Sequence, residues 1–220
     1  MVSWESIDTV LLDMDGTLLD LYYDNTLWNE HLPVRYSEFH DLELDTARRQ
    51  LTAHMVEHHG KLTFYCLDHW AELTGLDIVA LHREQHLTDL IRFRPNAEVL
   101  LEWLKRHNKR SMLVTNAHRA SLEVKNRFAP VTHHLDAAVS CHDYGAPKET
   151  VEFWQSLAVE HPFDPERTLL IDDTHNVLAA AALHGIRHLL TIAQPDSGKP
   201  PRANLDFPAI EDFREILPDA

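Results

Sequence analysis

The sequence predicts an α/β protein: a Rossmann-like parallel sheet with helices on both faces, and a helical cap inserted after the first strand. Three observations predict this fold. Short apolar runs alternate with amphipathic stretches from Pro95 onward, polar residues follow the ends of those runs, and residues 21–91 show helical periodicity without a convincing strand. Alternating elements of this kind form parallel sheets covered by helices. We therefore expect a core of residues 1–20 and 92–220 and a cap of residues 21–91.

The individual elements follow from their apolar patterns. Val10-Leu11-Leu12 is a short apolar run, typical of a strand buried in a parallel sheet. In the cap, apolar residues such as Leu51 and Met55 recur at the spacing of amphipathic helices. After the cap, helices are expected at 96–107, 121–128, 149–160 and 177–184, and strands at 111–115, 137–140, 168–171 and 186–192. A Pro- and Gly-rich loop at 194–201 then precedes a short terminal helix with Ile210, Phe213 and Ile216.

Length, composition and charge narrow the class of protein. The 220 residues, 44% of them hydrophobic, suffice to fill one core with a smaller insertion. The formal charge of -15 repels polyanions, so a nucleic-acid polymer is not expected as a partner. No apolar run approaches the roughly 20 residues of a membrane span, and the start lacks the features of a signal peptide. We expect a soluble, cytoplasmic protein without a membrane partner; the sequence leaves its oligomeric state open.

Cysteine and histidine usage points to no special scaffold. Cys66 and Cys141 are far apart and form no Cys-x-x-Cys pair, so we expect two small buried hydrophobes in a reducing compartment. Most of the 17 histidines are expected at the surface.

Two carboxylates follow the first predicted strand. The segment Asp13-Met14-Asp15-Gly16-Thr17 comes directly after the apolar run. Side chains two apart on an extended segment point to the same face, and ligands of open α/β sheets bind at the carboxyl ends of the strands. Asp13 and Asp15 can therefore reach one substrate.

Polar residues also follow three later strands. Each is ordinary alone, as a turn, a helix cap or a solvated charge. Together they place a hydroxyl, a lysine and a second pair of carboxylates on the same rim of the sheet as the first pair, and these are the parts needed to move a phosphoryl group. The residues are Thr115-Asn116, Lys148 and Asp172-Asp173.

This order of motifs resembles the haloacid dehalogenase-like (HAD) hydrolase superfamily, and the resemblance covers the whole core. It implies that Asp13 is the nucleophile, which attacks phosphorus to give an aspartyl-phosphate. Asp15 would protonate the departing alcohol and then deprotonate the attacking water. Lys148, with a cation, would offset the negative charge of the carboxylates and the phosphate.

The resemblance also implies a cation and a cradle for the phosphate. Mg²⁺ suits an oxygen site made of the Asp13 carboxylate, the Asp15 backbone carbonyl and Asp173, with Asp172 as a supporting partner. The phosphoryl oxygens would be held by Thr115 and by the backbone N–H groups of Gly16 and Asn116, with Lys148.

The superfamily contains several reactions, and the residues favour some of them. Asp15 and Asp173 argue against dehalogenation, which needs neither. Transport ATPases place a threonine two residues after the nucleophile and carry membrane helices, and both are missing here. A phosphatase or a phosphomutase acting on a small phosphomonoester is expected.

A narrower resemblance points to the substrate. Leu21 to Asn25, Phe64 to Trp70, Thr115 to His118 and Pro195 to Gly198 look like the bacterial GMP/IMP 5′-nucleotidases, although His69 stands where an aromatic residue is expected. The resemblance implies a purine nucleoside 5′-monophosphate as substrate, with GMP and IMP not distinguished and a sugar phosphate or other phosphometabolite as the alternative.

Several cap residues have aromatic or polar side chains that could contact such a substrate. They are Tyr22, Tyr23, Asp24, Asn25, Tyr65 and Trp70, with Trp28 as a further aromatic. Aromatic residues at helical spacing more often form the core of a cap. Arg92 and Arg94, where the chain returns to the core, fit a solvated role and a phosphate-steering role about equally.

Two hypotheses from other functional classes remain as alternatives to a phosphatase. His54-Met55-Val56-Glu57-His58 fits the pattern of inverted zinc peptidases, with both histidines one turn apart on a helix, but it supplies only two histidine ligands. A binding module that keeps the fold without catalysis is the other, and the complete set of motifs argues against it.

Overall fold

A six-stranded, all-parallel sheet forms the core of the computed structural model, which describes residues 2–218. The strand order is 3-2-1-4-5-6, so the direction in which the chain adds strands reverses at the central first strand, where ligands of such sheets bind. The predicted fold class is confirmed. The strands are β1 (Thr9–Leu12), β2 (Arg110–Thr115), β3 (Ala137–Ser140), β4 (Thr168–Ile171), β5 (His188–Ile192) and β6 (Ala209–Ile210).

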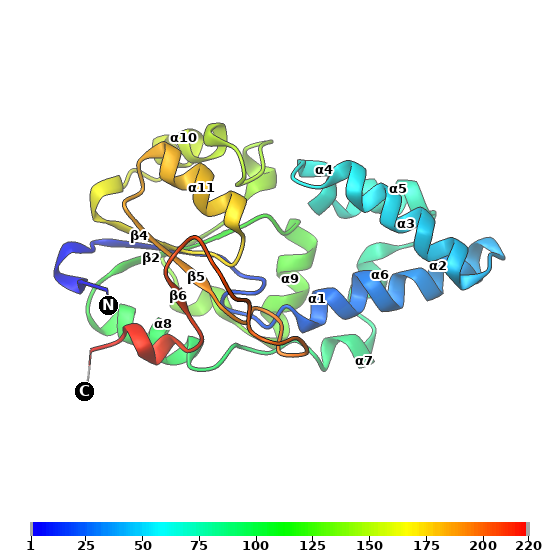
Figure 1. Cartoon of the computed structure of the whole chain (residues 1–220), viewed down its shortest axis with the longest axis horizontal. Coiled ribbons are helices and arrows are strands. Elements are labelled where there is room, and N and C mark those ends of the chain that lie inside the picture. The colour runs from blue at the N-terminus through cyan, green and yellow to red at the C-terminus, as the bar shows by residue number, and fades with distance from the viewer. Residues whose placement is uncertain (1, 219–220) are drawn as a thin grey trace.

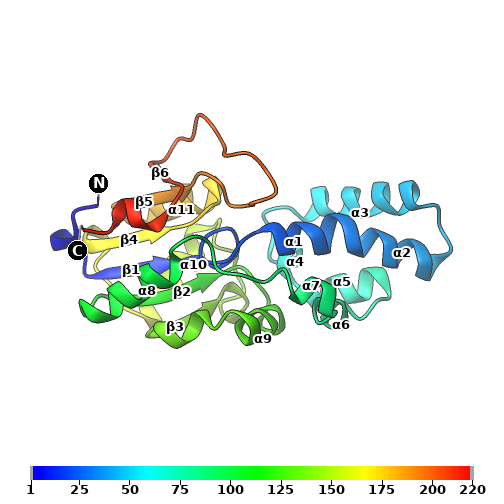
Figure 2. The ribbon, with the colours of Figure 1, turned by 90° about the horizontal axis from the view of Figure 1, so that it is seen from below.

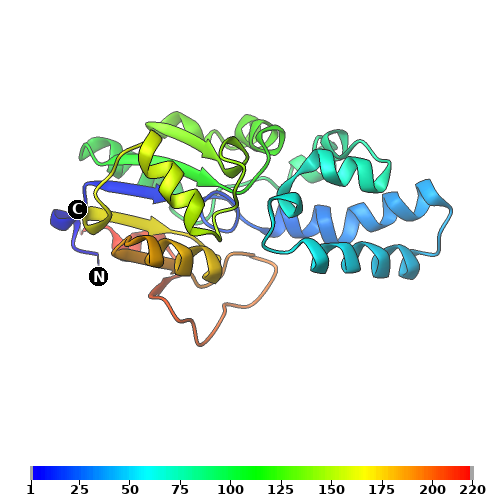
Figure 3. The same cartoon turned by 90° about the horizontal axis from the view of Figure 1, so that it is seen from above.

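Helices cover both faces of the sheet (Figure 1). Figure 2 shows α8 (Ala97–Arg106) and α9 (Arg119–Phe128) over one face, and Figure 3 shows α10 (Val151–Glu160) and α11 (His175–His184) over the other. Alternation along β1 explains this: Val10 and Leu12 pack in one cluster with α8 and α9, and Leu11 packs in a second cluster with α10 and α11.

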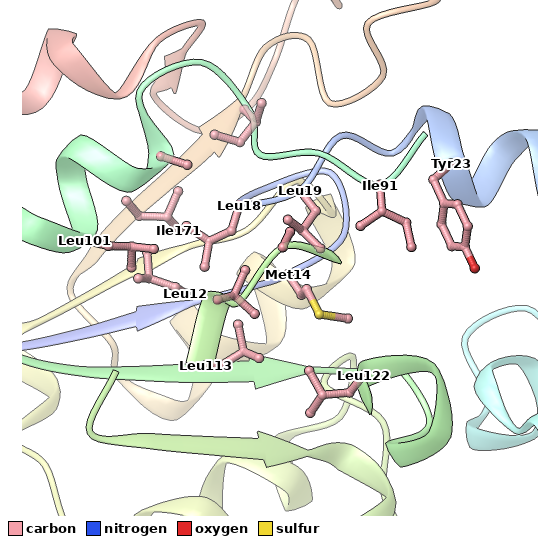
Figure 4. Close-up of a cluster of buried hydrophobic side chains, with 14 of the residues drawn as sticks. Leu12, Met14, Leu18, Leu19, Tyr23, Ile91, Leu101, Leu113, Leu122 and Ile171 are labelled. Carbon is pink, nitrogen blue, oxygen red and sulfur yellow. The ribbon is translucent and has the colours of Figure 1, made fainter. Parts of the chain in front are cut away.

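The first of these clusters reaches from the sheet toward the cap. Leu12 of β1, Leu113 of β2 and Ile171 of β4 lie side by side and face Leu101 of α8 (Figure 4). Tyr23 belongs to the same continuous cluster. Apolar contact therefore runs from the sheet into the inserted helices, which favours a defined placement of the two parts.

The helices between residues 22 and 88 lie beyond the carboxyl ends of the strands, toward which the arrows point in Figure 2. Helix α1 passes through a π-helical turn, Leu27–His31, directly into α2; Pro33 at the start of α2 lacks the N–H that a regular turn would use there. The helices are α1 (Tyr22–Thr26), α2 (Leu32–His40), α3 (Leu44–His58), α4 (Leu62–Tyr65), α5 (Leu67–Thr74), α6 (Ile78–His82) and α7 (Gln85–Thr88).

The two segments that connect this helical part to the sheet are bonded to each other. The N–H of Asp20 donates to the carbonyl of Arg92 at 3.0 Å, and the Arg92 Nε donates to the Asp20 carboxylate at 3.0 Å. Arg92 also donates to Ser197 Oγ at 2.7 Å, and buried Arg94 donates to the carbonyl of Glu211 at 3.1 Å. Both arginines thus fasten the connection, and neither lines the cavity described below. We propose residues 21–91 as the cap on this basis.

The end of the chain differs from the expectation. The sheet does not end at β5, because Ala209 and Ile210 pair with Thr191 and Ile192 as a sixth strand. Ile210 therefore does not belong to the terminal helix, which is a short 3₁₀ turn at Phe213–Ile216. A two-residue strand after Pro208 is too short to show an apolar pattern of its own.

Among residues 2–218, no helix combines the length and the apolar character needed to cross a bilayer.

Candidate active site

Strand β1 delivers Asp13 to the carboxyl edge of the sheet. β1 lies in register between β2 and β4, and the N–H of Asp13 donates a 3.0 Å hydrogen bond to the carbonyl of Ile171, the last residue of β4. Because Asp172 and Asp173 follow β4 directly, the register places them beside Asp13. The ligand oxygens of these three carboxylates lie within 4.8 Å of one another.

Lys148 lies between two of these carboxylates. Its Nζ is 2.6 Å from Asp13 Oδ1 and 2.7 Å from Asp172 Oδ2, and it donates a third hydrogen bond, of 3.0 Å, to the carbonyl of Val114. The side chain of Lys148 is only 2% exposed, and that of Asp172 is 1% exposed. Buried charges at this spacing attract strongly, and together the three bonds fix the ammonium group.

Burial and charge shift the pKa values of this group in a consistent way. Burial raises the pKa of Asp13 well above its ordinary value, against the attraction of Lys148, and burial also raises the pKa of Asp172. Burial alone would lower the pKa of Lys148, but the carboxylates of Asp13 and Asp172 raise it above its ordinary value. Lys148 is therefore charged at neutral pH, and it offsets a negative charge that burial makes unfavourable.

Asp173 faces the cavity, whereas Asp172 does not. Both oxygens of Asp172 are already used, one by Lys148 and one by the N–H of Thr174 at 2.9 Å. Burial, followed by the neighbouring Asp172 charge, raises the pKa of Asp173 to about 7. Asp13 and Asp173 offer only oxygen donors, and their negative charge is only partly compensated by nearby positive groups. This donor set fits a hard divalent cation such as Mg²⁺.

The end of β2 adds Thr115 and Asn116 to the same place. Thr115 Oγ1 accepts a 3.0 Å hydrogen bond from the N–H of Ala117, which orders the loop after the strand. The Asn116 side chain accepts the N–H of Lys148 at 2.9 Å and donates to Glu149 at 2.9 Å. Asn116 therefore supports the loop that carries Lys148, and both Thr115 and Asn116 line the cavity.

Asp15 is held by a residue that the sequence did not single out. Lys125 Nζ lies 2.7 Å from Asp15 Oδ1 and 2.6 Å from Asp24 Oδ1, and the Lys125 side chain is 1% exposed. Burial opposes the charge of Lys125, yet Asp15 and Asp24 raise its pKa above the ordinary value. Since Asp24 lies in α1 and Lys125 in α9, this pair joins the helical part to the core beside Asp15. The available signal was a lysine on the apolar face of a helix, next to Leu122.

The Gly16 amide is not free for a phosphate, which corrects the expectation. Its N–H donates a 2.8 Å hydrogen bond to the carbonyl of Leu19. Gly16 instead provides space: its φ is +85°, and a Cβ there would lie 2.7 Å from Asp173 Oδ2 and 3.1 Å from Pro195 Cβ. The glycine permits both the left-handed turn and the close approach of Asp173.

A cavity of about 390 Å³ opens above these carboxylates, within the range of small-molecule sites. Both parts of the chain line it. The core contributes Asp13, Asp15, Thr115, Asn116, Ala117, His118, Ser121, Lys125, Lys148, Asp173 and Thr174, and the helical part contributes Leu21, Asp24, Asn25, Trp28, Asn29, Met55, His59, Phe64, Tyr65, Leu67, Trp70 and His82.

The cap residues singled out from the sequence divide into two groups. Asp24, Asn25, Tyr65 and Trp70 line the cavity, as does Trp28, whose ring lies 5.4 Å from that of Trp70. Tyr65 donates to Glu149 at 2.5 Å and so reaches from the cap to the core.

Tyr22 and Tyr23 do not line the cavity. The Tyr22 ring packs against Gly198, and Tyr23 is 1% exposed, with its hydroxyl 2.7 Å from Nδ1 of His82. His82, which the sequence did not single out, does line the cavity, and burial lowers its pKa to about 3. Neither tyrosine is therefore placed to contact a substrate bound in this cavity.

The His54, Glu57 and His58 side chains do lie together on α3, with ligand atoms within 4.8 Å of one another. None of them lines the cavity, and His58 Nδ1 is 2.8 Å from Thr63 Oγ1. The three side chains are therefore not part of the site at the sheet edge.

The fold and the cluster at its sheet edge define a hydrolase of the Rossmann-like α/β class with a carboxylate and lysine centre. The model of the haloacid dehalogenase-like hydrolase family matches residues 7–185, and the chain belongs to this family. Over 219 residues it is 38% identical to the GMP/IMP nucleotidase YrfG of Escherichia coli strain K12, covering 99% of this chain and 97% of that protein, and equally to YrfG of Shigella flexneri. The expected family and the expected enzyme class, a phosphomonoester hydrolase, are confirmed.

Solved structures agree on the fold. A HAD phosphatase from Thermococcus onnurineus superposes with a TM-score of 0.78 at 17% identity, covering 95% of each chain. CbbY from Rhodobacter sphaeroides, in complex with phosphate, superposes with a TM-score of 0.63 at 19% identity, covering 95% of this chain and 96% of that one. At these identities the likeness concerns the fold, and the chemistry is argued from the site.

Proposed function

We propose that this protein hydrolyses purine nucleoside 5′-monophosphates, GMP or IMP, by forming an aspartyl-phosphate on Asp13 with the help of Mg²⁺. The observation that carries the proposal is the juxtaposition of Asp13, Lys148 and Asp173 at the floor of a cavity whose walls are aromatic and polar. A phosphate at this floor meets a carboxylate nucleophile and a fixed cation, while the rest of the substrate meets the cap.

Asp13 supplies the nucleophile. One of its carboxylate oxygens bonds to phosphorus as the bond between phosphorus and the ester oxygen breaks, which divides one difficult displacement into two easier ones. Lys148 holds the Asp13 carboxylate in place from 2.6 Å and offsets the negative charge that gathers when the phosphate enters. Asp172 positions Lys148, because it binds the same ammonium group from 2.7 Å.

Asp15 moves the proton in both steps. It gives a proton to the departing ester oxygen, and it then takes one from the water that attacks the phosphorus of the intermediate. Lys125, bonded to Asp15, fixes the direction of that carboxylate and connects it to Asp24 of the cap. Thr115 lines the cavity on the β2 side, where its hydroxyl can donate to a phosphoryl oxygen.

Asp13, the backbone carbonyl of Asp15 and Asp173 would hold the Mg²⁺. When bound, the cation neutralises charge on the phosphate and so lowers the barrier to attack by a carboxylate. The raised pKa values of Asp13 and Asp173 indicate carboxylates whose charge the protein alone compensates poorly, which favours a bound cation.

The cap favours a nucleotide over a smaller phosphate ester. Trp28, which packs against the buried Trp70, offers apolar surface for a base, and Asp24 and Asn25 offer polar atoms for a base or a ribose. The identity of 38% to GMP/IMP nucleotidases over nearly the whole chain supports the same substrate class.

Phosphate release from a panel of monophosphates tests the proposal. We expect kcat/KM for GMP or IMP to exceed that for pyrimidine nucleotides and sugar phosphates, because those lack the purine ring that packs against the aromatic side chains of the cavity. We also expect activity to fall to background after chelation of divalent cations and to return with Mg²⁺. Preference for a sugar phosphate would overturn the substrate, and full activity without any divalent cation would overturn the metal.

A further inference from the structure

A second group of metal-binding side chains lies at the boundary between the cap and the core. Cys66 stands between α4 and α5 of the cap, His118 stands just before α9, and His142 lies in a short turn after β3. The thiol sulfur and one ring nitrogen from each histidine lie within 4.8 Å of one another. Three segments far apart in the sequence thus bring a thiol and two imidazoles to one point.

The hydrogen bonding of this group is incomplete. Nε2 of His142 is buried and has no hydrogen-bond partner among the described residues 2–218. Buried polar atoms are nearly always paired, so an unpaired one needs an explanation. Cys66 is a free thiol. The His118 and His142 rings lie 5.0 Å apart at an angle of 79°, so they are not stacked.

The surroundings of the two histidines favour a cation here. The Asp68 carboxylate lies 3.8 Å from Nε2 of His118 and supplies negative charge at the open side. Nδ1 of His118 accepts a long hydrogen bond of 3.3 Å from the N–H of Ala120. Metal binding at Nε2 would break that one hydrogen bond. The free energy lost would be small compared with the binding free energy of a zinc site made of a thiolate and imidazoles.

We infer that Cys66, His118 and His142 form a site for a thiophilic divalent cation, Zn²⁺ by chemical class, separate from the all-oxygen site at Asp13 and Asp173. One thiolate and two imidazoles are a donor set that suits zinc, with a fourth position left for water or another ligand. Mg²⁺, which prefers oxygen, is not expected to bind there.

The site has a mechanical consequence. Cys66 belongs to the cap, whereas His118 and His142 belong to the core, so a bound ion ties one to the other beside the cavity that His118 lines. Occupancy holds the cap against the core and opposes its opening for exchange of substrate and product.

Cobalt substitution tests the site on the whole protein and without any nucleotide. Co²⁺ bound to a thiolate gives a charge-transfer absorption in the near ultraviolet, which carboxylate sites do not give. We expect this band on titration of the wild type with Co²⁺, and its loss on addition of Zn²⁺, which competes for the site. The band should vanish in Cys66→Ser, and Co²⁺ affinity should fall by about 100-fold or more in His118→Gln and His142→Gln.

Two control variants separate this site from others. Cys141→Ala removes the other cysteine, whose thiol is buried against the carbonyl of Asn116, and should keep the band. His58→Gln alters the histidine group on α3 and should also keep it. A wild type without the band, or a band that survives Cys66→Ser, overturns the inference.

Thiol labelling provides a measurement that needs no variant to fold. A thiol reagent should modify Cys66 in the wild type, and Zn²⁺ should slow this modification while Mg²⁺ should not. Equal labelling rates with and without Zn²⁺ overturn the inference. Because neither readout depends on turnover, failure here leaves the proposed nucleotidase activity untouched, and failure of the nucleotidase assay leaves this site untouched.

Discussion

At the scale of single residues, the site depends on one buried ammonium group. Lys148 makes contact with Asp13, Asp172 and a backbone carbonyl, and its removal leaves two buried carboxylates without a counter-charge. Removing one partner of a buried ion pair is far more harmful than the net contribution of the pair suggests. By the proposed mechanism, the same residue governs both stability and reactivity.

Lys148→Ala should lower both the stability and the activity of the protein. We expect the free energy of unfolding to fall by about 3–5 kcal/mol in chemical denaturation, and kcat to fall by roughly 10²- to 10³-fold or more. Lys105→Ala, at an exposed position on α8, is the matched control and should change stability by less than about 0.5 kcal/mol. A Lys148→Ala protein of normal stability and near-normal kcat would refute the charge role.

Gly16→Ala should act through Asp173. A methyl group at residue 16 would meet Asp173 Oδ2 at 2.7 Å, so the carboxylate must move, and the Mg²⁺ concentration for half-maximal activity should rise by about 10- to 100-fold. Gly60→Ala is the control, since Gly60 also has positive φ but its added Cβ would meet nothing within 4 Å. Both should lose about 1–2 kcal/mol from the backbone. An unchanged Mg²⁺ requirement in Gly16→Ala would contradict this account.

Residues that act through chain order were found from the sequence, whereas residues that act through packing were not. Thr115 ends a strand and Asp13, Lys148 and Asp173 come after one, and parallel strands bring their ends together. Lys125 reaches its carboxylates only because α9 packs where it does, and no local pattern shows its two partners.

Among the elements, the contact between α1 and α6 has a specific pH dependence. His82 of α6 is buried against Tyr23 of α1, and burial lowers its pKa from 6.5 to about 3. Below pH 6.5 this histidine therefore binds a proton in the unfolded chain, whereas in the folded chain it stays neutral down to about pH 3. The contribution of this group to stability is thus complete above pH 6.5 and is lost as the pH falls through that window.

His82→Gln should flatten this dependence. Between pH 7 and pH 4.5 the wild type should lose about 2.7 kcal/mol more than the variant, since each pH unit below 6.5 costs about 1.4 kcal/mol. Tyr23→Phe removes the hydroxyl but keeps the imidazole, so it should retain the steeper slope. Urea denaturation across this pH range measures the difference, and identical slopes in the wild type and His82→Gln would contradict it.

Most elements of the core were predictable because each has its own hydrophobic periodicity and ends at a turn. The strands at 137–140 and 168–171 lie where their apolar runs predicted them. β6 was not, because its pairing with β5 arises from the path of the loop that precedes it. The continuous helical path through α1 and α2 shows why helix boundaries are hard to predict from sequence. A proline such as Pro33 usually marks a helix boundary, but here a π-helical turn lets the chain continue from one helix into the next.

At the scale of the whole molecule, the active site belongs to neither part alone. The core supplies the carboxylates and Lys148, and the cap supplies the aromatic wall. The polar links that cross between them near the cavity include Lys125 to Asp24, Tyr65 to Glu149, and Asn25 to Asp196. We interpret the arrangement as a closed state, in which the walls exclude water from the phosphate.

The central claim, that Asp13 forms a covalent bond to phosphorus, can be tested by chemical trapping. Asp15→Asn, which by this account slows hydrolysis of the intermediate, is mixed with p-nitrophenyl phosphate and Mg²⁺, because p-nitrophenolate leaves without needing a proton. The reaction is quenched and reduced with borohydride, and peptides are analysed by mass spectrometry. We predict conversion of Asp13 to homoserine, absent when Asp13→Asn is added to the variant. Steady phosphate release with an unmodified Asp13 would contradict the account.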